Sequence, residues 1–472
     1  MSFPQRVWRS IPLSLIVTLA LAIRLWYVTT LPGQGGQDIL FSDMHAYDYS
    51  AWCLVQGRPV TGEPGFNGYH PLSASTYYFV GYTYFLAAIY ALFGHELAAV
   101  RVIQGVVGAA TVGLVSLVGS LTFGRRPGLV SALLTAIYLP LVYYAGLLLT
   151  ETWFTFLQMG ALALWLRAWA GGPNSVALEP GPGGAAGPAP DRPGTNAVTG
   201  SLLALAAGLT AGMACLSRAA FVLATGMLAA AGCFIPPVPM PRAQRVARVA
   251  AFLLGAAVVI APITVRNYQI HGRFYLISTN GPSTFLTGHV SHVPTLPAGL
   301  PPGMTDAEMA ERHRALSFQY LRRHWTTYLA ELPKFFAIIW TDNDFWPGTF
   351  TTWSRTPDAG AARMDLHIHS RGSPPFGRAT YFPDLIRHAD RLIWGTVGLP
   401  TGILAALFLP GRHRRWLVLY LALVPYLVIP FIASAFPRFR MPAVPLVFVL
   451  AGQALVACWD CRSRRPGGGA SS

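Results

Sequence analysis

The chain has 472 residues, of which 53% are hydrophobic and only 11% are charged, and its formal net charge at pH 7 is +15. Soluble domains carry about 25% charged residues, so the composition excludes a set of ordinary soluble domains and indicates a polytopic membrane protein. A strongly basic chain could bind nucleic acid, but the distribution of the charge, described below, argues against that class.

Ten apolar stretches of about 20 residues follow one another along the sequence, each long enough to cross ~30 Å of hydrocarbon as a helix. They cover residues 11–31, 98–121, 128–148, 150–168, 198–216, 219–237, 247–265, 391–410, 416–434 and 441–459. The first stretch is long and lacks a small-residue cleavage site, so we expect it to remain as a membrane anchor. The sequence therefore predicts an all-α bundle of about ten transmembrane helices.

The basic residues are concentrated on one side of this predicted bundle. If the N-terminus is cytoplasmic and the helices alternate in direction, the cytoplasmic segments hold 15 arginines and three acidic residues, a net +12. This asymmetry follows the positive-inside rule, so it predicts cytoplasmic termini and no binding to nucleic acid. Arginine almost replaces lysine, and alanine, glycine and proline are abundant, so we expect a bacterial protein of the inner (plasma) membrane.

The aromatic stretch 75–93 is long enough to be an eleventh spanning helix. Counting it as one would place the clusters at Arg125, Arg242 and Arg412 outside, against the positive-inside rule. We therefore expect it to lie in the outer membrane interface, where its tyrosines keep their hydroxyl groups in water. An ordinary spanning helix remains the alternative.

The first outer loop, residues 32–97, contains the polar sequence FSDMHAYDYSAW. Asp43, Tyr47 and Ala51 are four residues apart, so in a helix they share one face, with the Asp43 carboxylate near the positive end of the helix dipole. Trp52 and the aliphatic residues after it would hold this helix at the bilayer surface. We identify Asp43 as the candidate catalytic base.

A second acid, Glu151, lies in the tight turn GLLLTET between the third and fourth spans, with apolar residues on both sides. A carboxylate at a membrane boundary is costly without a partner and is a functional candidate by default. A structural ion pair with a nearby arginine is the alternative.

Several arginines are predicted to lie at the membrane level of these two acids. A single arginine there is most often an interfacial anchor, but five beside two carboxylates predict a site for an anionic lipid headgroup. The five are Arg24, Arg218, Arg266, Arg438 and Arg440.

The remaining sequence divides the chain into three parts: a transmembrane module at 1–267, a large outer region at 268–390, and terminal helices with a basic tail at 391–472. Within the first part, the Gly/Pro/Ala tract 171–197 is predicted to be a flexible cytoplasmic linker. The outer region is expected to begin with strand and turn character in RFYLISTNG and to continue as an amphipathic helix from Thr305.

Metal-binding sequence patterns are sparse. The outer region holds HxxH and HxH pairs, and Cys458 and Cys461 form a lone CxxC near the C-terminus. Neither pattern comes with a second set of ligands. We therefore predict no metal site from these residues.

The motifs occur in an order that resembles a known family. The chain is similar to the polytopic glycosyltransferases of the GT-C fold, specifically the family 39 group related to protein O-mannosyltransferases, the lipid A aminoarabinose transferase and the rhizobial lipopolysaccharide galacturonosyltransferases. The resemblance is carried by SDMHAYDYSAW, GYTYFLAAIYALFGHELAAVRVIQ, YYAGLLLTETWF, RNYQIHGRFYLISTNG and RFRMP. It covers the N-terminal 290 residues well and the rest thinly.

The resemblance implies a GT-C helical bundle with two juxtamembrane helices in the first outer loop and a long outer loop after the seventh span. It implies an enzyme that moves a sugar from a polyprenyl phosphate to an acceptor hydroxyl of a glycolipid or protein, on the outer face of the membrane. In this reading Asp43 is the base and Glu151 a second active-site acid. The resemblance also allows a divalent cation between them, for which the sequence shows no ligand set.

One departure concerns the lipid phosphate. Relatives often have a Pro-Pro or Lys-Pro-Pro element before the second juxtamembrane helix, whereas this chain reads YHPLSASTYYFVGY, with no lysine. We therefore expect arginines to contact the phosphate instead. The candidates for binding the lipid phosphate or the sugar are Arg24, Tyr47, Tyr69, His70, Arg218, Arg266, Asn267, Arg438 and Arg440.

A single displacement at the sugar would invert the anomeric centre, and inversion is the expected outcome. The alternative from another class is a transporter or flippase of lipid-linked sugar, since intramembrane charges serve transport too. Such a transporter is expected to show inverted repeats with broken helices, which this sequence lacks.

Overall fold

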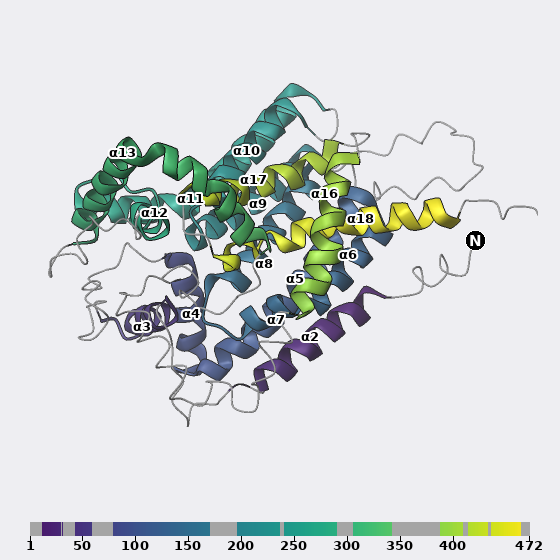
Figure 1. Ribbon diagram of the computed structural model, residues 1–472, viewed down its shortest axis with the longest axis horizontal. Helices are drawn as coiled ribbons and strands as arrows, with labels where there is room; N and C mark the ends of the chain where they lie inside the picture. Colours follow the sequence, from purple (N-terminus) through teal and green to yellow (C-terminus); the bar gives the residue numbers. More distant parts are fainter. Residues whose placement is uncertain are drawn as a thin grey trace, which may run out of the picture.

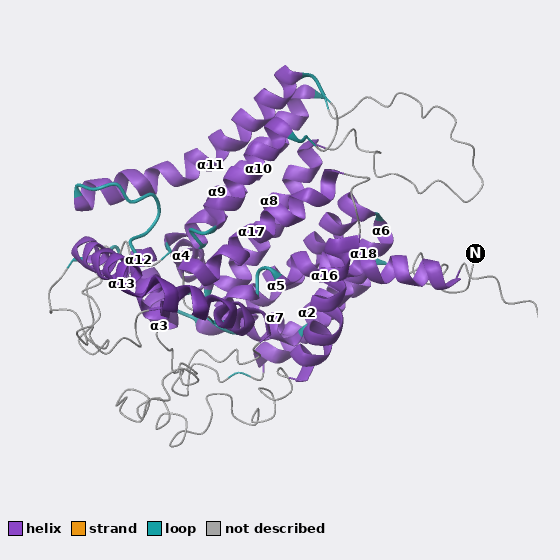
Figure 2. Cartoon of the chain, turned by 45° about the horizontal axis from the view of Figure 1, so that its top comes forward, coloured by secondary structure: helices purple, strands orange, loops and turns teal. Residues whose placement is uncertain are grey.

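The computed structural model describes residues 12–29, 31, 43–58, 79–169, 196–236, 240–289, 305–341, 388–408, 414–432 and 436–463. Within these ranges the chain is built from helices joined by short loops, and no strand is present (Figure 2). The predicted positions Tyr69 and His70, most of the linker, and residues 342–387 of the predicted outer region lie outside the described residues.

The N-terminal half supplies nine helices in the described ranges. In chain order they are α2 (Leu13–Thr29), α3 (Asp43–Val55), α4 (Val80–Phe93), α5 (Leu97–Phe123), α6 (Arg125–Ile137), α7 (Leu139–Ala145), α8 (Thr150–Trp169), α9 (Ala197–Ser217) and α10 (Phe221–Phe234).

The C-terminal half contains the two longest described helices and three short helices that are not α-helical. In chain order its helices are α11 (Arg242–His271), α12 (Gly281–His289), α13 (Asp306–Thr341), the π-helix η3 (Asp390–Gly398), α16 (Leu399–Phe408), the 3-10 helix η4 (Arg414–Trp416), α17 (Leu417–Ile432), the 3-10 helix η5 (Pro437–Arg440) and α18 (Val444–Ser463).

Each predicted span coincides with a helix or with two consecutive helices. In the described part of the chain, α5, α9, α11 and α18 are each long and apolar enough to cross a membrane. The pair α6 and α7 is a fifth candidate if the two helices are counted as one span. The two helices are bent by 59° relative to each other, and Pro140 lies in the first turn of α7 at this bend. The helical membrane bundle is confirmed, while the number of ten crossings stays a prediction.

Small residues allow α9 and α11 to approach closely. A Cβ atom added to Gly208 of α9 would lie 2.0 Å from the carbonyl oxygen of Phe252 in α11. A Cβ atom at Gly255 of α11 would lie 2.4 Å from the carbonyl oxygen of Leu205 in α9. Only glycine permits this backbone contact, which is common between membrane helices.

The predicted juxtamembrane stretches of the first loop form α3 and α4, which lie at the same end of the molecule as α12 and α13, on the left of Figure 1. We call this end the Asp43 end. Polar contacts join α3 to α4: Asp48 accepts hydrogen bonds from the Tyr90 hydroxyl and from Nε2 of His95 at 2.9 Å. The His95 ring stacks on Trp52, with centroids 4.8 Å apart.

The strand character predicted for RFYLISTNG is wrong, since residues 273–280 are irregular. The reason is Asn267, a buried residue near the end of α11. Its Nδ2 donates hydrogen bonds to the carbonyls of Tyr275 at 3.2 Å and Ile277 at 3.0 Å. A side chain therefore takes the place of a neighbouring strand as the hydrogen-bond partner of this backbone.

The amphipathic helix predicted after Thr305 is present as α13 and begins with a capping box. The backbone N–H of Thr305 donates to Glu308 Oε2 at 2.9 Å, and the backbone N–H of Glu308 donates to Thr305 Oγ1 at 3.3 Å. The helix is kinked at His324.

Candidate active site

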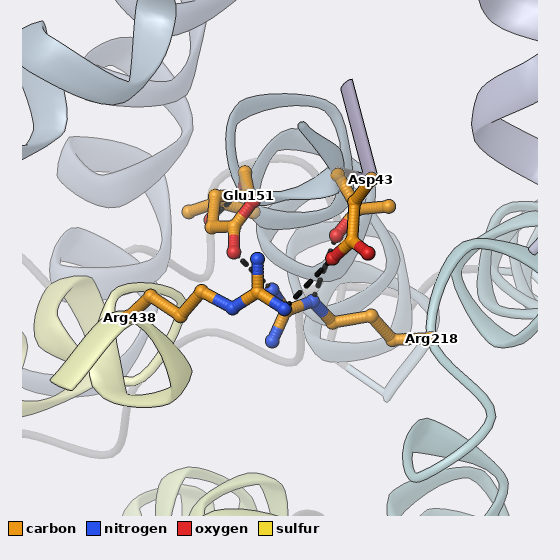
Figure 3. Close-up of polar contacts among 6 residues, drawn as sticks. Asp43, Glu151, Arg218 and Arg438 are labelled. Atoms are coloured by element: carbon orange, nitrogen blue, oxygen red, sulfur yellow. Dashed lines mark hydrogen bonds and ion pairs between the residues drawn. The ribbon is translucent and has the colours of Figure 1, made fainter. Parts of the chain in front are cut away.

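Two carboxylates from distant parts of the chain lie together at the Asp43 end. Asp43 is the first residue of α3, and Glu151 lies in the first turn of α8. Each carboxylate is therefore near the positive end of its helix dipole. Figure 3 shows that the side chains of Arg218 and Arg438 approach them from opposite sides.

Arg438 of η5 pairs with Asp43. Its Nη2 donates a hydrogen bond to Asp43 Oδ2 at 2.8 Å, and the two side chains are 26% and 32% exposed. Burial lowers the pKa of Arg438, but the carboxylates of Asp43 and Glu151 outweigh this effect and raise the pKa above its ordinary value. The guanidinium is therefore a permanent cation in reach of both acids.

Arg218, directly after α9, pairs with Glu151. Its Nη2 donates to Glu151 Oε1 at 2.6 Å, and its Nε donates to Thr150 Oγ1 at 3.1 Å. The Glu151 side chain is only 2% exposed, and its Oε2 has no hydrogen-bond partner among the described residues. One oxygen of this buried carboxylate is thus left for another group.

Two aromatic residues bring the ion pairs into one site. The Phe439 ring centroid lies 5.5 Å from the guanidinium carbon of Arg438 and 5.7 Å from that of Arg218. Tyr47 of α3 is buried, and its pKa is raised by burial, by Asp43 and by Glu151. The Tyr47 hydroxyl therefore stays protonated beside the two acids.

Neighbouring helices place these residues. A Cβ atom at Gly81 of α4 would lie 2.6 Å from Ser217 Oγ, so α4 packs directly on the residue before Arg218. Arg101 of α5 donates through Nε to the carbonyl of Gly146 at 3.2 Å. This contact supports the turn that leads into Glu151.

Arg440 lies in the same short helix as Arg438 but forms no hydrogen bond or ion pair with Asp43 or Glu151 among the described residues. It is fully buried, with Nη2 donating to Asp390 Oδ2 at 2.7 Å and Nη1 donating to the carbonyl of Ile339 at 3.1 Å. The Tyr138 hydroxyl donates to the other oxygen of Asp390. Arg440 therefore joins η5 to α13 and η3 instead of facing a ligand.

The three other predicted ligand residues that the structure describes are Arg24, Asn267 and Arg266. Arg24 is buried in α2 and donates to the carbonyls of Ala20 at 3.0 Å and Ala136 at 3.4 Å. Asn267 holds the loop after α11, as described above, and Arg266 precedes it. None of the three makes a hydrogen bond or ion pair with Asp43 or Glu151 in the described structure.

Sequence reasoning missed Thr150 and Phe439. Both are adjacent in sequence to residues that were singled out, so inspection of the neighbours of Glu151 and Arg438 would have found them. It also missed two polar residues inside apolar spans, Gln104 and Gln158, although such residues are rare in spanning helices and are functional candidates for that reason.

The described residues offer no set of ligands for the divalent cation that the resemblance allows. They contain no group of three or more His, Cys, Asp or Glu side chains that could hold a metal ion. The two carboxylates already accept hydrogen bonds from guanidinium groups. We therefore assign no catalytic step to a metal, and the divalent cation rests on the resemblance alone.

Comparison with known proteins supports the fold. The model of the dolichyl-phosphate-mannose-protein mannosyltransferase family matches residues 79–177, a range that contains Glu151 but not Asp43. A comparison with curated protein sequences finds no match.

Solved structures with a similar fold come from an archaeon and a bacterium. The apo oligosaccharyltransferase of Archaeoglobus fulgidus has a TM-score of 0.51 at 15% identity, over 95% of this chain and 51% of that one. The same enzyme, AglB, in complex with an inhibitory peptide and a dolichol-phosphate has a TM-score of 0.51 at 14% identity, over 98% and 51%. ArnT from Cupriavidus metallidurans, bound to undecaprenyl phosphate, has a TM-score of 0.50 at 14% identity, over 95% and 61%.

The chain is thus a membrane protein with the fold of the GT-C glycosyltransferases. It spans about half to three fifths of the length of these similar proteins. The predicted fold class is confirmed.

Proposed function

We propose that the protein is a membrane glycosyltransferase that moves a sugar from a polyprenyl-phosphate donor to an acceptor hydroxyl. The proposal is carried by one observation: two carboxylates and two arginines from four distant segments meet at the Asp43 end of a GT-C fold. A reaction that removes a proton from a hydroxyl and releases a phosphate needs one group of each charge, and this site holds both.

Asp43 is the proposed base. Its Oδ2 is bound by Arg438, while its Oδ1 accepts no hydrogen bond from the described residues. The acceptor O–H bond would break as its proton moves to Asp43, the acceptor oxygen would bond to the anomeric carbon, and the bond from that carbon to the phosphate oxygen would break. The electron pair of the broken bond stays with the phosphate oxygen, and the single displacement inverts the configuration of the anomeric carbon.

Arg438 and Arg218 are the proposed partners of the phosphate. A guanidinium is always charged and donates two parallel hydrogen bonds to phosphate oxygens. Both groups lie beside the same Phe439 ring, so one anion could meet both. Negative charge that develops on the leaving phosphate would be stabilised by fixed cations.

The similar proteins support this donor class. The name of the matching family contains a dolichyl-phosphate-linked mannose. Two of the similar structures are complexes, one with dolichol-phosphate and one with undecaprenyl phosphate. The charge distribution of the chain supports an active site on the outer face of a bacterial inner membrane. The acceptor would be a glycolipid or a protein.

The test is the replacement Asp43→Asn. Loss of a general base typically costs about 10²- to 10⁴-fold in rate, so we expect transfer to vanish while undecaprenyl phosphate still binds. The matched control is Asp460→Asn, which removes a carboxylate paired with Arg126 far along α18 and should leave transfer unchanged.

The measurement is mass spectrometry of envelope glycans from cells that lack the protein and are complemented with each variant. A fully active Asp43→Asn protein would exclude Asp43 as the base. A product with retained anomeric configuration, seen by NMR, would exclude the single displacement. A transporter of lipid-linked sugar would show no new glycosidic bond in a purified system.

A further inference from the structure

A buried glutamine, Gln104 of α5, connects α4 to the turn before Glu151. Its Oε1 accepts a hydrogen bond from the Tyr82 hydroxyl at 2.9 Å, and its Nε2 donates to the carbonyls of Ala145 at 3.1 Å and Leu147 at 2.8 Å. Ala145 is the last residue of α7, where a helix leaves backbone carbonyls without a partner inside the helix, and Leu147 lies in the turn that follows. We call these contacts the Gln104 network.

The Gln104 network reaches the supports of both acids. Residues 146–149 lead directly into α8, so the bonds to this turn fix the position at which α8 begins, one residue before Glu151. On the other side, the Tyr82 ring packs edge-on against Tyr47, with centroids 5.1 Å apart. Tyr47 lies one helical turn after Asp43 in α3, so the same glutamine supports the helix of the proposed base.

A second buried glutamine, Gln158, also binds one tyrosine hydroxyl and a backbone carbonyl, in this case next to the short helix that carries Arg438. Gln158 lies in α8, two turns after Glu151. Its Nε2 donates to the carbonyl of Pro442 at 2.8 Å, and its Oε1 accepts the hydrogen bond of the Tyr426 hydroxyl from α17. Pro442 follows η5, the short helix that carries Arg438. We call these contacts the Gln158 network.

The chemistry of a glutamine argues that these contacts have a purpose beyond packing. Both glutamines are fully buried in the bundle, where an amide is costly unless all its groups are hydrogen-bonded. A methionine would fill a similar volume without that cost. In both networks the amide donates to a backbone carbonyl next to the site, outside the interior of a helix, so the bonds order segments that helical hydrogen bonds do not hold.

We propose, on the basis of the glycosyltransferase function proposed above, that Gln104 and Gln158 are positioning residues with separate tasks. Gln104 fixes the positions of Asp43 and Glu151 relative to each other for the chemical step. Gln158 holds Arg438 in place for the donor phosphate. Neither residue touches the reacting atoms.

The experiment compares Gln104→Met with Gln158→Met. A misplacement of about 1 Å can cost on the order of 10²-fold in rate, so Gln104→Met is expected to lower kcat by about 10- to 100-fold with KM for the donor near the wild-type value. Gln158→Met is expected to raise KM and to weaken binding of undecaprenyl phosphate to the purified protein by about tenfold, the scale of one lost charge-assisted contact, with kcat changed less.

Two milder variants keep the test valid if a methionine prevents folding. Tyr82→Phe and Tyr426→Phe each remove one hydroxyl and leave one glutamine oxygen unpaired. They are expected to reproduce the two patterns at smaller size. Because each keeps its ring, the contact between Tyr47 and the ring at position 82 stays in place.

Hydrogen–deuterium exchange gives a readout that does not depend on activity. Exchange is expected to rise in residues 139–154 in the Gln104 variants and in residues 436–445 in the Gln158 variants, each without the other. If all variants change the same segment and the same kinetic parameter, or change none, the separate tasks are disproved. If the wild type transfers no sugar from any polyprenyl phosphate, the proposed function fails, whereas the exchange pattern still decides on the two networks.

Discussion

Arg438 and Arg440 are two residues apart in one 3-10 helix, yet they have opposite surroundings. The pair of Arg438 with Asp43 is partly exposed, at 26% and 32%, whereas the pair of Arg440 with Asp390 is almost completely buried, at 0% and 3%. An exposed pair is open to a ligand, and a buried pair holds helices together. An arginine at the predicted membrane level can therefore face a ligand or join helices, depending on whether its carboxylate partner is partly exposed or buried.

The largest expected effect comes from breaking the buried pair with Arg440→Met. Removal of one partner leaves the Asp390 carboxylate buried without its cation, which typically costs about 3–5 kcal/mol. We expect a much lower melting temperature in detergent, measured by thermal unfolding. The control is the double variant Arg440→Met with Asp390→Leu, which removes both charges and should recover part of the loss. An unchanged melting temperature in the single variant would contradict a structural role for this pair.

The exposed pair should respond in the opposite way. Arg438→Met removes an ion pair of a kind that contributes about 0.2–1 kcal/mol, so the melting temperature should change little. Arg438 is proposed both to bind the donor phosphate and to stabilise the negative charge that develops on it. Loss of a fixed cation of this kind typically costs about 10²- to 10³-fold in rate, so KM for the donor should rise, kcat/KM should fall by that order and transfer should nearly vanish. Arg440→Met and Arg438→Met therefore separate stability from activity within one turn of helix. An Arg438→Met protein with a much lower melting temperature but unchanged specific activity would reverse the assignment.

Part of this arrangement could be predicted from the sequence. Apolar length fixed the position of the helices, and the ends of the spans placed Asp43, Glu151, Arg218 and Arg438 at one level. The structure brings these four together. Hydrophobic patterning works well here because each helix must satisfy its own backbone in the membrane.

The pairing of the arginines could not be predicted. In a 3-10 helix with three residues per turn, side chains two positions apart point in different directions, so FPRFRMP does not show which arginine faces the core. Asp390, the partner of Arg440, lies 50 residues earlier in the chain, at the start of a π-helix that no periodicity indicated. The irregular loop 273–280 after α11 was missed for a similar reason. The Asn267 side chain, and not a neighbouring strand, binds the backbone carbonyls of this loop.

The smallest expected effect concerns the other end of the helix that Arg440 holds. Arg440 binds the carbonyl of Ile339 near the C-terminus of α13, whereas its N-terminus depends on the exposed capping box of Thr305 and Glu308. The backbone N–H and the hydroxyl of Thr305 lower the pKa of Glu308. A carboxyl group with a lowered pKa stabilises the folded state above its unfolded pKa, and this contribution is lost as the pH falls through the lower, folded value.

Hydrogen–deuterium exchange in the first turn of α13 should therefore increase when the pH is lowered from 7 to values below 4.5, the ordinary pKa of the group, after correction for the intrinsic exchange rate. Glu308→Gln should remove most of this pH dependence, since a glutamine amide does not titrate in this range. The end of α13 held by Arg440 should show a smaller change, because a guanidinium does not titrate in this range. Equal pH dependence at both ends of α13 would mean that the exposed capping box and the buried contact of Arg440 do not differ in their response to pH. The contrast between Arg438 and Arg440 would then need a cause other than exposure.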